Sequence, residues 1–261
     1  MLSIVIAEKE KHVNRERPSR STVDQAHSYS RIRGGTLLRT VALALILAIG
    51  VPAMAGATAN ANALAPSLGA AANFAVLAGA AVTCTNATVT GNIGVFPGSA
   101  VTQTTCPIIG AIDGGDTTAA LAATDAALAS TALAAQPCDS TLTGLGSLTL
   151  SPGVYCFDAA ATETGGVLTL SGPSDGIWIF KIGTLGTGAL TGTNFTVAMD
   201  GGGQACNVYW RVADAATLTD SVFVGTILGG ADITVTRGTV NGRIMAAAGI
   251  TITGTAFTGC N

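Results

Sequence analysis

Beyond residue 55 this chain contains no histidine and almost no positive charge. Its two histidines are His12 and His27, and 8 of its 12 Lys and Arg residues also precede Gly56. The cations that remain are Lys181, Arg211, Arg237 and Arg243. The lack of histidine excludes the commonest general base and metal ligand. Four scattered cations cannot neutralise a run of phosphates, which argues against nucleic acid as a partner.

Eleven acidic residues stand against these four cations, so the net charge of this part of the chain is 4 − 11 = −7. The acids are scattered, and no carboxylate pair recurs at a fixed offset, whereas hydrolysis of a glycoside needs two carboxylates that face each other. The turns also lack the repeated aspartates of a calcium-binding coil. We therefore expect no enzymatic activity, no metal, no cofactor and no small-molecule substrate.

The first 65 residues have the composition of a leader and secretory signal peptide. Three arginines between residues 31 and 39 precede an apolar run over 41–51, which is too short to span a bilayer comfortably. A small-x-small cleavage pattern follows at 53–55, and a second possible cut follows 63–65. We expect 66–261 to be a single domain that is secreted, either released or retained at the cell surface. The alternative is a single-pass membrane anchor.

All six cysteines lie in the part of the chain that we expect to be exported. An even number outside the cytosol, with no C-x-x-C spacing, favours disulfides over zinc. Six cysteines allow 15 pairings, and the sequence alone does not choose among them. Our expectation is Cys84 with Cys106, Cys138 with Cys156, and Cys206 with Cys260; the alternative is that some are buried thiols.

A short repeat near the C-terminus indicates the fold class. The segments that begin at Ala216, Ile233 and Ile250 lie 17 residues apart, and each alternates apolar residues with threonine. A fixed short period of strand-like segments is the signature of a β-solenoid. Because side chains in a strand alternate between two faces, Leu218 should point inward and the threonines on either side of it outward.

One segment does not follow this pattern. Residues 116–136 contain no glycine or proline and consist mostly of Ala and Leu, with Asp116 as a helix N-cap. We expect a helix about 116–136 packed along the solenoid, with its alanine-rich face allowing close approach. Apolar residues recur at helical spacing at Leu121, Leu128, Ala132 and Ala135, with Thr124 on the same stripe. The aromatic segments 177–180 and 208–212 should fill the core rather than form a sugar-stacking platform.

Several blocks, in order, resemble the secreted ice-binding protein family of cold-adapted bacteria, fungi and algae. They are LGAAANFAVLAG at 68–79, VTGNIGVFPG at 89–98, SPGVY at 151–155, IWIF at 177–180, GQACNVYW at 203–210 and TVNGR at 239–243. Each block is weak alone, but together they cover nearly all of 67–261. The resemblance implies a mainly β fold, a right-handed discontinuous β-helix (β-solenoid) with one long helix alongside and N-terminal coils inserted out of chain order.

The resemblance also implies adsorption to ice through a Thr-[Ala/Gly]-x-[Thr/Asn] motif on one flat face. Thr191–Asn194 fits this motif completely, and the blocks that begin at Thr85, Thr219, Thr236 and Thr253 fit it in part. Each block is followed by an apolar residue, which suggests that all five occupy equivalent points of the coil. The candidate ice-binding residues are Thr85, Thr88, Thr191, Thr193, Asn194, Thr217, Thr219, Ser221, Thr234, Thr236, Thr239, Thr251, Thr253 and Thr255.

Arg237 and Asp220 depart from the motif, and they would weaken adsorption if they faced outward. The predicted function is ice binding by a monomer, with thermal hysteresis or inhibition of ice recrystallisation. The alternative is an extracellular adhesin or cell-envelope solenoid that binds polysaccharide or protein, which exposed aromatic residues on one face would favour.

Overall fold

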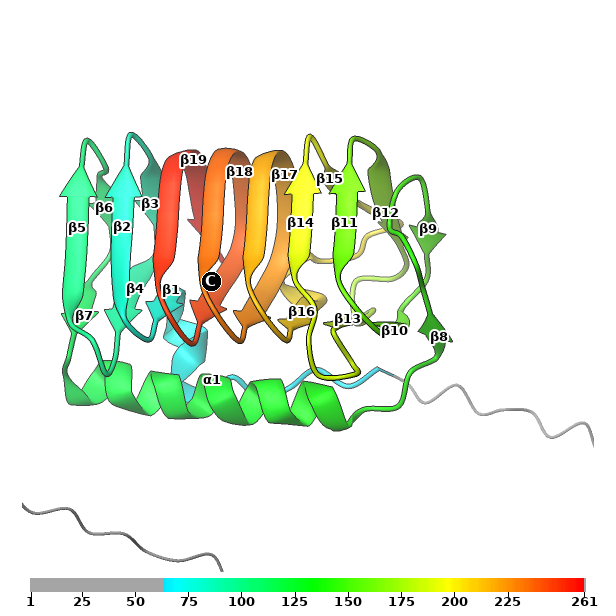
Figure 1. Ribbon diagram of the computed structural model, residues 1–261, viewed down its shortest axis with the longest axis horizontal. Helices are drawn as coiled ribbons and strands as arrows, with labels where there is room; N and C mark the ends of the chain where they lie inside the picture. Colours follow the sequence, from blue (N-terminus) through cyan, green and yellow to red (C-terminus); the bar gives the residue numbers. More distant parts are fainter. Residues whose placement is uncertain (1–62, 261) are drawn as a thin grey trace, which may run out of the picture. The chain divides into compact units, whose positions relative to one another are not determined.

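The computed structural model describes residues 63–260, which form a β-solenoid of three parallel sheets with one helix alongside (Figure 1). The leader proposed from the sequence lies outside the described residues up to position 62. A complete coil passes through all three sheets in turn. The prediction of a mainly β solenoid with one long helix is confirmed.

The first sheet is the face turned toward the viewer in Figure 1. It is built from seven neighbouring strands, and three of them are the leading parts of longer strands that continue around a corner. In spatial order its strands are β5 (Ala100–Thr104), β2 (Ala81–Thr85), β19 (Ile250–Gly259), β18 (Ile233–Ala246), β17 (Ala216–Gly229), β14 (Leu190–Thr193) and β11 (Ala161–Thr164).

The second and third sheets repeat this order with the remaining strands. The second contains β6 (Ile108–Ile109), β3 (Thr88–Thr90), the continuations of β19, β18 and β17, then β15 (Thr196–Asp200), β12 (Val167–Ser171) and β9 (Thr149–Leu150). The third contains β7 (Ile112–Gly114), β4 (Asn92–Val95), β1 (Phe74–Ala78), the ends of β18 and β17, then β16 (Val208–Val212), β13 (Trp178–Ile182), β10 (Gly153–Phe157) and β8 (Ser140–Thr141).

The coils do not follow chain order. Strand β19, at the C-terminal end, pairs with β2 and β3, and β1 pairs with both β18 and β4. The first strand of the domain therefore completes the coil that the last strand begins, and Figure 1 shows β19 directly beside β2. This arrangement agrees with the out-of-order insertion that the family resemblance implied.

Helix α1 (Thr117–Ala135) carries the chain from one end of the solenoid to the other, between β7 and β8 (Figure 1). The Asp116 carboxylate accepts a hydrogen bond from the Ala119 N–H at 2.8 Å, which is the expected N-cap. At the other end, buried Lys181 donates through Nζ to the carbonyls of Ala134 (2.9 Å) and Gln136 (2.6 Å). A cation from the third sheet thus satisfies carbonyls that the helix terminus leaves unpaired.

The helix packs through alanine, as expected, but the leucine stripe identified from the sequence lies on its outer face. The buried residues are Ala119, Ala122, Ala129 and Leu133, whereas Leu121 and Leu128 are 64% and 62% exposed, and Thr124, Ala132 and Ala135 are exposed as well. Small side chains let the helix axis approach the sheet closely along most of its length, and Leu133 is the one large side chain that the helix buries.

The core consists of stacked columns of inward side chains, as the 17-residue repeat predicts. Leu218, Val235 and Ile252 pair in register and are almost completely buried. The aromatic column lies in the core too: Phe180 and Trp210 stack with ring centroids 4.0 Å apart, and Trp210 lies 4.9 Å from Phe223. Leu145 closes one end of the core, and its N–H donates to the Glu163 carboxylate.

Three disulfides join distant parts of the chain. Cys84 is bonded to Cys106, Cys138 to Cys156, and Cys206 to Cys260, which are the pairs that we expected. The last of these ties the C-terminal end of the chain to a segment 54 residues earlier.

Candidate functional site

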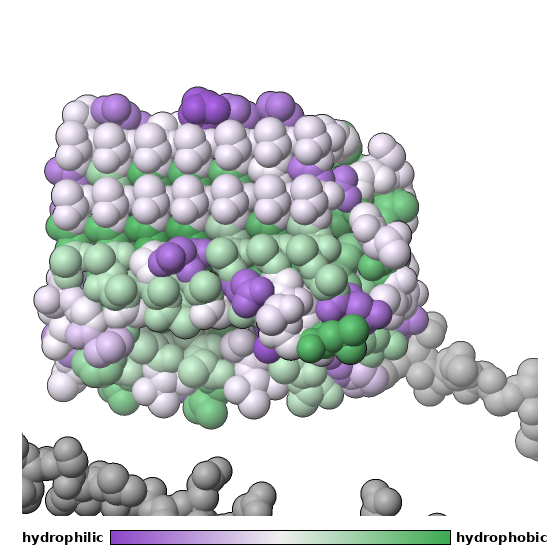
Figure 2. All heavy atoms as spheres, viewed as in Figure 1, coloured by the Kyte–Doolittle hydropathy of each residue, from purple (hydrophilic) through white to green (hydrophobic). Residues whose placement is uncertain are grey.

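The first sheet carries two straight rows of threonine, which we call the threonine grid. Each of its seven strands contributes the two outward residues of a Thr-x-Thr segment, and the pairing register aligns every segment with the next. The first row is Thr102, Thr83, Thr251, Thr234, Thr217, Thr191 and Thr162. The second row is Thr104, Thr85, Thr253, Thr236, Thr219, Thr193 and Thr164. Figure 2 shows the two rows as parallel lines of identical side chains.

The grid is held flat by the core behind it. The residue between the two threonines of each strand points inward, and in the central coils this residue is Leu218, Val235 or Ile252, each no more than 1% exposed. The threonines themselves are exposed or half-buried. Continuous parallel pairing across seven strands therefore fixes the position of each threonine before any ligand arrives.

A third line of small residues borders the grid on one side. Two positions before each first-row threonine stand, in spatial order, Ala100, Ala81, Gly249, Asp232, Ala215, Ala189 and Ala160. Six of these seven are Ala or Gly, and the Asp232 carboxylate accepts the Gly249 N–H at 2.7 Å. The surface beside the grid is therefore low and mostly apolar, and only one charge interrupts it (Figure 2).

A tight corner borders the grid on the other side. The residue after each second-row threonine has a left-handed backbone, with φ between 49° and 72°: Thr105, Asn86, Gly254, Arg237, Asp220, Asn194 and Gly165. Gly, Asn and Asp adopt this conformation most readily, and five of the seven positions hold one of them. The corner turns the chain sharply away, so that the grid ends at a defined edge.

Asp220 and Arg237 occupy neighbouring corner positions and do not interrupt the rows. The Arg237 Nε and Nη2 atoms donate to the Asp220 carboxylate oxygens at 2.5 and 2.6 Å. This hydrogen bonding lowers the pKa of Asp220 and raises that of Arg237. Both side chains do face outward, with Arg237 59% and Asp220 36% exposed, but they lie one residue beyond the second row and pair with each other.

The structure also corrects the alignment of the motif blocks. Thr191 pairs with Thr217 and Thr193 with Thr219, so the block that begins at Thr191 lies two residues out of register with the block that begins at Thr219. The blocks were aligned on the apolar residue that follows each of them, and this residue does not occupy the same point in every coil. Phe195 follows the corner directly, and its N–H bonds to the Ser221 hydroxyl at 3.2 Å; in the next coil two residues separate the corner from the apolar position.

Nine of the fourteen candidate residues lie in the grid, and five do not. Ser221 and Thr255 are 2% exposed, and their hydroxyls bond to the carbonyls of Thr219 and Thr253, so neither can contact an external surface. Thr88 and Thr239 point outward from the second sheet. Asn194 is a corner residue.

Five grid threonines were missed by sequence reasoning: Thr83, Thr102, Thr104, Thr162 and Thr164. Each belongs to a Thr-x-Thr segment whose middle residue is Cys84, Gln103 or Glu163 instead of an aliphatic side chain. The apolar alternation that marked the central strands is therefore absent from them. The Thr-x-Thr spacing itself was the signal that could have located them.

Little else on the described surface resembles a site for chemistry. Among residues 63–260, no group of three or more His, Cys, Asp or Glu side chains is placed to hold a metal ion. Within the same range every aromatic residue is buried except Phe96, which is half-buried. The exposed aromatic face that would favour a carbohydrate-binding adhesin is therefore missing from this part of the chain.

The chain is similar in sequence to proteins described as ice-binding. A family described as "Ice-binding-like" matches residues 76–258. An ice-binding protein of Nostoc sp. (strain HG1) is 39% identical over 192 residues, which cover 70% of this chain and 69% of that protein.

Solved structures agree with the sequence relatives. The crystal structure of an ice-binding protein from an Antarctic biological consortium superposes with a TM-score of 0.71 at 30% identity, covering 76% of this chain and 92% of that one. The ice-binding protein of the Antarctic ascomycete Antarctomyces psychrotrophicus gives a TM-score of 0.70 at 28% identity, covering 76% of this chain and all of that one.

Proposed function

The chain belongs to the ice-binding-like family, and on this premise we propose that it adsorbs to ice through the threonine grid. The observation that carries the proposal is the alignment of fourteen outward threonines in two rows of seven. Adsorption of this kind would produce thermal hysteresis, inhibit recrystallisation, or do both.

The dimensions of the grid suit a crystalline ligand. Neighbouring parallel strands lie about 4.7–4.9 Å apart, and outward residues of one strand recur every 6.4–6.8 Å or so. Six intervals between seven strands then give rows about 28–29 Å long. The grid therefore repeats regularly in two dimensions, with spacings of the same order as the oxygen spacing of ice. Binding of a dissolved ligand does not require such a repeat.

The chemistry of threonine suits the same ligand. The methyl group keeps neighbouring water ordered around an apolar surface, and the hydroxyl can donate and accept hydrogen bonds that anchor this water to the protein. β-Branching restricts the side-chain rotamers, so little conformational entropy remains to be lost on binding. No single contact needs to be strong, because many form at once on a preorganised face.

Two matched substitutions test the assignment of this face. Thr234 is the central residue of the first row, and Thr239 is an exposed threonine of the same strand on the second sheet. Thr234→Tyr should remove most of the thermal hysteresis because a protruding ring keeps a flat crystal surface away from its neighbours. Thr239→Tyr should leave thermal hysteresis near the wild-type value, and both variants should keep the wild-type unfolding midpoint.

Equal loss in both variants, or full activity in Thr234→Tyr, would contradict the assignment. Thr253→Tyr and Thr191→Tyr provide the same test in the second row and near one end of the first. Both residues belong to the grid, so we expect each substitution to lower activity.

We further propose that the domain is exported and acts as a monomer at the ice surface. Three disulfides are typical of an oxidising compartment, which supports export. The Leu64 backbone exchanges two hydrogen bonds with the Gln136 side chain, at 2.9 and 2.8 Å. Cleavage after residue 65 would remove Leu64 and with it this contact. The contact therefore favours cleavage after residue 55. Mass spectrometry of the secreted protein distinguishes the two.

A further inference from the structure

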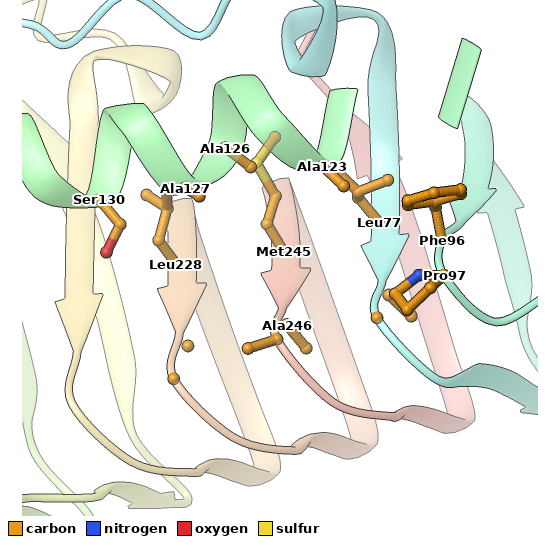
Figure 3. A pocket seen from close by; sticks show the side chains of 15 residues that line it. Leu77, Phe96, Pro97, Ala123, Ala126, Ala127, Ser130, Leu228, Met245 and Ala246 are labelled. Atoms are coloured by element: carbon orange, nitrogen blue, oxygen red, sulfur yellow. The ribbon is translucent and has the colours of Figure 1, made fainter. Parts of the chain in front are cut away.

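An apolar groove of about 360 Å³ lies between helix α1 and the third sheet, on a different side of the solenoid from the threonine grid. Figure 3 shows Leu228, Met245 and Leu77 rising from neighbouring strands toward the helix, where they meet Ala127, Ala126 and Ala123 in that order. These strands are β17, β18 and β1, and the chain that follows β4 adds Phe96 at the far end.

The groove exists because the helix turns its large side chains away from it. Leu121 and Leu128 are exposed to solvent, whereas the helix lines the groove with Ala123, Ala126 and Ala127. Protein interiors are normally close-packed, and apolar space left unfilled costs van der Waals contact. A ligand that filled this space would recover these contacts and stabilise the folded state.

The walls of the groove offer almost no unpaired polar group. The backbone N–H groups at the corners beneath it already bond within the solenoid: Gly79 to Ala246 at 3.0 Å, Ala247 to Gly229 at 2.9 Å, and Gly230 to Val212 at 3.0 Å. No charged side chain lines it, and Ser130, at the Leu228 end, contributes the one side-chain hydroxyl (Figure 3). Such a surface favours an apolar ligand with at most one polar end.

The shape of the groove narrows the class of ligand further. Its lining comes from four adjacent positions of the third sheet, so it extends over three strand spacings, or about 14 Å, parallel to the helix. A volume of 360 Å³ spread over that length is long and narrow. A compact ring system would fill the width of such a groove poorly, whereas an extended chain would follow it.

We propose that this groove binds a single unbranched aliphatic chain, with its polar end at the Ser130 hydroxyl. The site does not depend on the ice-binding function, because it shares no residue with the threonine grid. The bound molecule is a ligand of the folded protein, and no reaction is involved.

Binding of 1-decanol to the secreted protein, measured by isothermal titration calorimetry with cyclodecanol as the shape control, tests the proposal. We expect saturable 1:1 binding of decanol and at least tenfold weaker binding of cyclodecanol. Ala126→Phe fills the groove and should weaken decanol binding at least tenfold, whereas Leu128→Phe, on the outer face of the same helix, should leave it unchanged. Ala123→Leu is a smaller filling substitution that serves if Ala126→Phe does not fold.

Three outcomes would overturn the proposal: no saturable decanol binding by the wild type, equal binding of cyclodecanol, or undiminished binding by both filling variants. Sedimentation with phosphatidylcholine vesicles distinguishes binding of a free aliphatic molecule from binding of an aliphatic chain that is part of a lipid bilayer. We expect the protein to remain in the supernatant, and sedimentation with the vesicles would refute a site for free aliphatic chains.

Discussion

Substitution of Leu218 tests whether a rigid core supports the two rows of the grid. The side chain is 1% exposed and lies between Val235 in one coil and Gly192 in the other. Its Cδ2 atom occupies space that a side chain at position 192 would need, since a Cβ built on Gly192 would lie 3.1 Å from it. Leu218→Ala therefore opens a cavity that neither the glycine nor the hydrogen-bonded strands can close.

Buried leucine-to-alanine changes cost about 2–5 kcal/mol, with the larger values at sites that cannot collapse. We expect about 3–5 kcal/mol here, which corresponds to a fall of about 6–20 °C in Tm for a domain of this size. Denaturant and thermal unfolding measure both quantities. Thermal hysteresis should persist, because the variant remains folded near 0 °C and its grid is intact.

The contact between Gly192 and Leu218 fixes the sign expected of a double-mutant cycle. Gly192→Ala alone should destabilise the protein through its tight contact with Leu218, whereas in the Leu218→Ala background the added methyl group enters free space. Coupling of at least about 0.5 kcal/mol in favour of the double mutant is expected. A cost below about 1 kcal/mol for Leu218→Ala, or no coupling, would refute the packing argument.

Three further outcomes follow from the structure. Leu218→Asp should prevent folding, because it buries an unpaired charge, and circular dichroism of the variant checks this. Removing the Cys206–Cys260 disulfide by a double serine substitution should cost up to about 4 kcal/mol, more than removing either of the other two, because it closes the longest loop; ranked denaturant midpoints test the order. Thermal hysteresis should be constant from about pH 5 to pH 9, since the grid has no titratable group. The Asp220–Arg237 pair keeps its stabilising effect above the ordinary aspartate pKa and loses it only as the pH falls below that value, because the pKa of Asp220 is lowered. A pH-dependent activity in this range would implicate groups outside the grid.

The solenoid could be predicted because three successive coils begin at equal intervals along the chain. Their 17-residue period places Thr217, Thr234 and Thr251 in one row, and the structure pairs them in register. Elsewhere the interval between row neighbours changes with the loops, from 19 residues between Thr83 and Thr102 to 29 between Thr162 and Thr191. A search for a fixed period therefore finds only the central coils.

The remaining parts of the site depend on contacts that a linear sequence does not contain. Thr83 lies beside Thr251 because the first strand of the domain completes the last coil, which local pattern cannot reveal. The outward orientation of Leu121 and Leu128 likewise depends on how closely the helix approaches the sheet. Hydrophobicity alone favours the opposite orientation, and alanine-mediated close packing overrides it.

Adsorption of the fluorescently labelled secreted protein to a growing single-crystal ice hemisphere tests the central claim most directly. The account predicts that wild-type protein is incorporated into the ice on defined planes, and that Thr234→Tyr is largely excluded under the same conditions while Thr239→Tyr is incorporated. Exclusion of the wild type, or incorporation of all three proteins alike, would contradict the claim that the threonine grid binds ice.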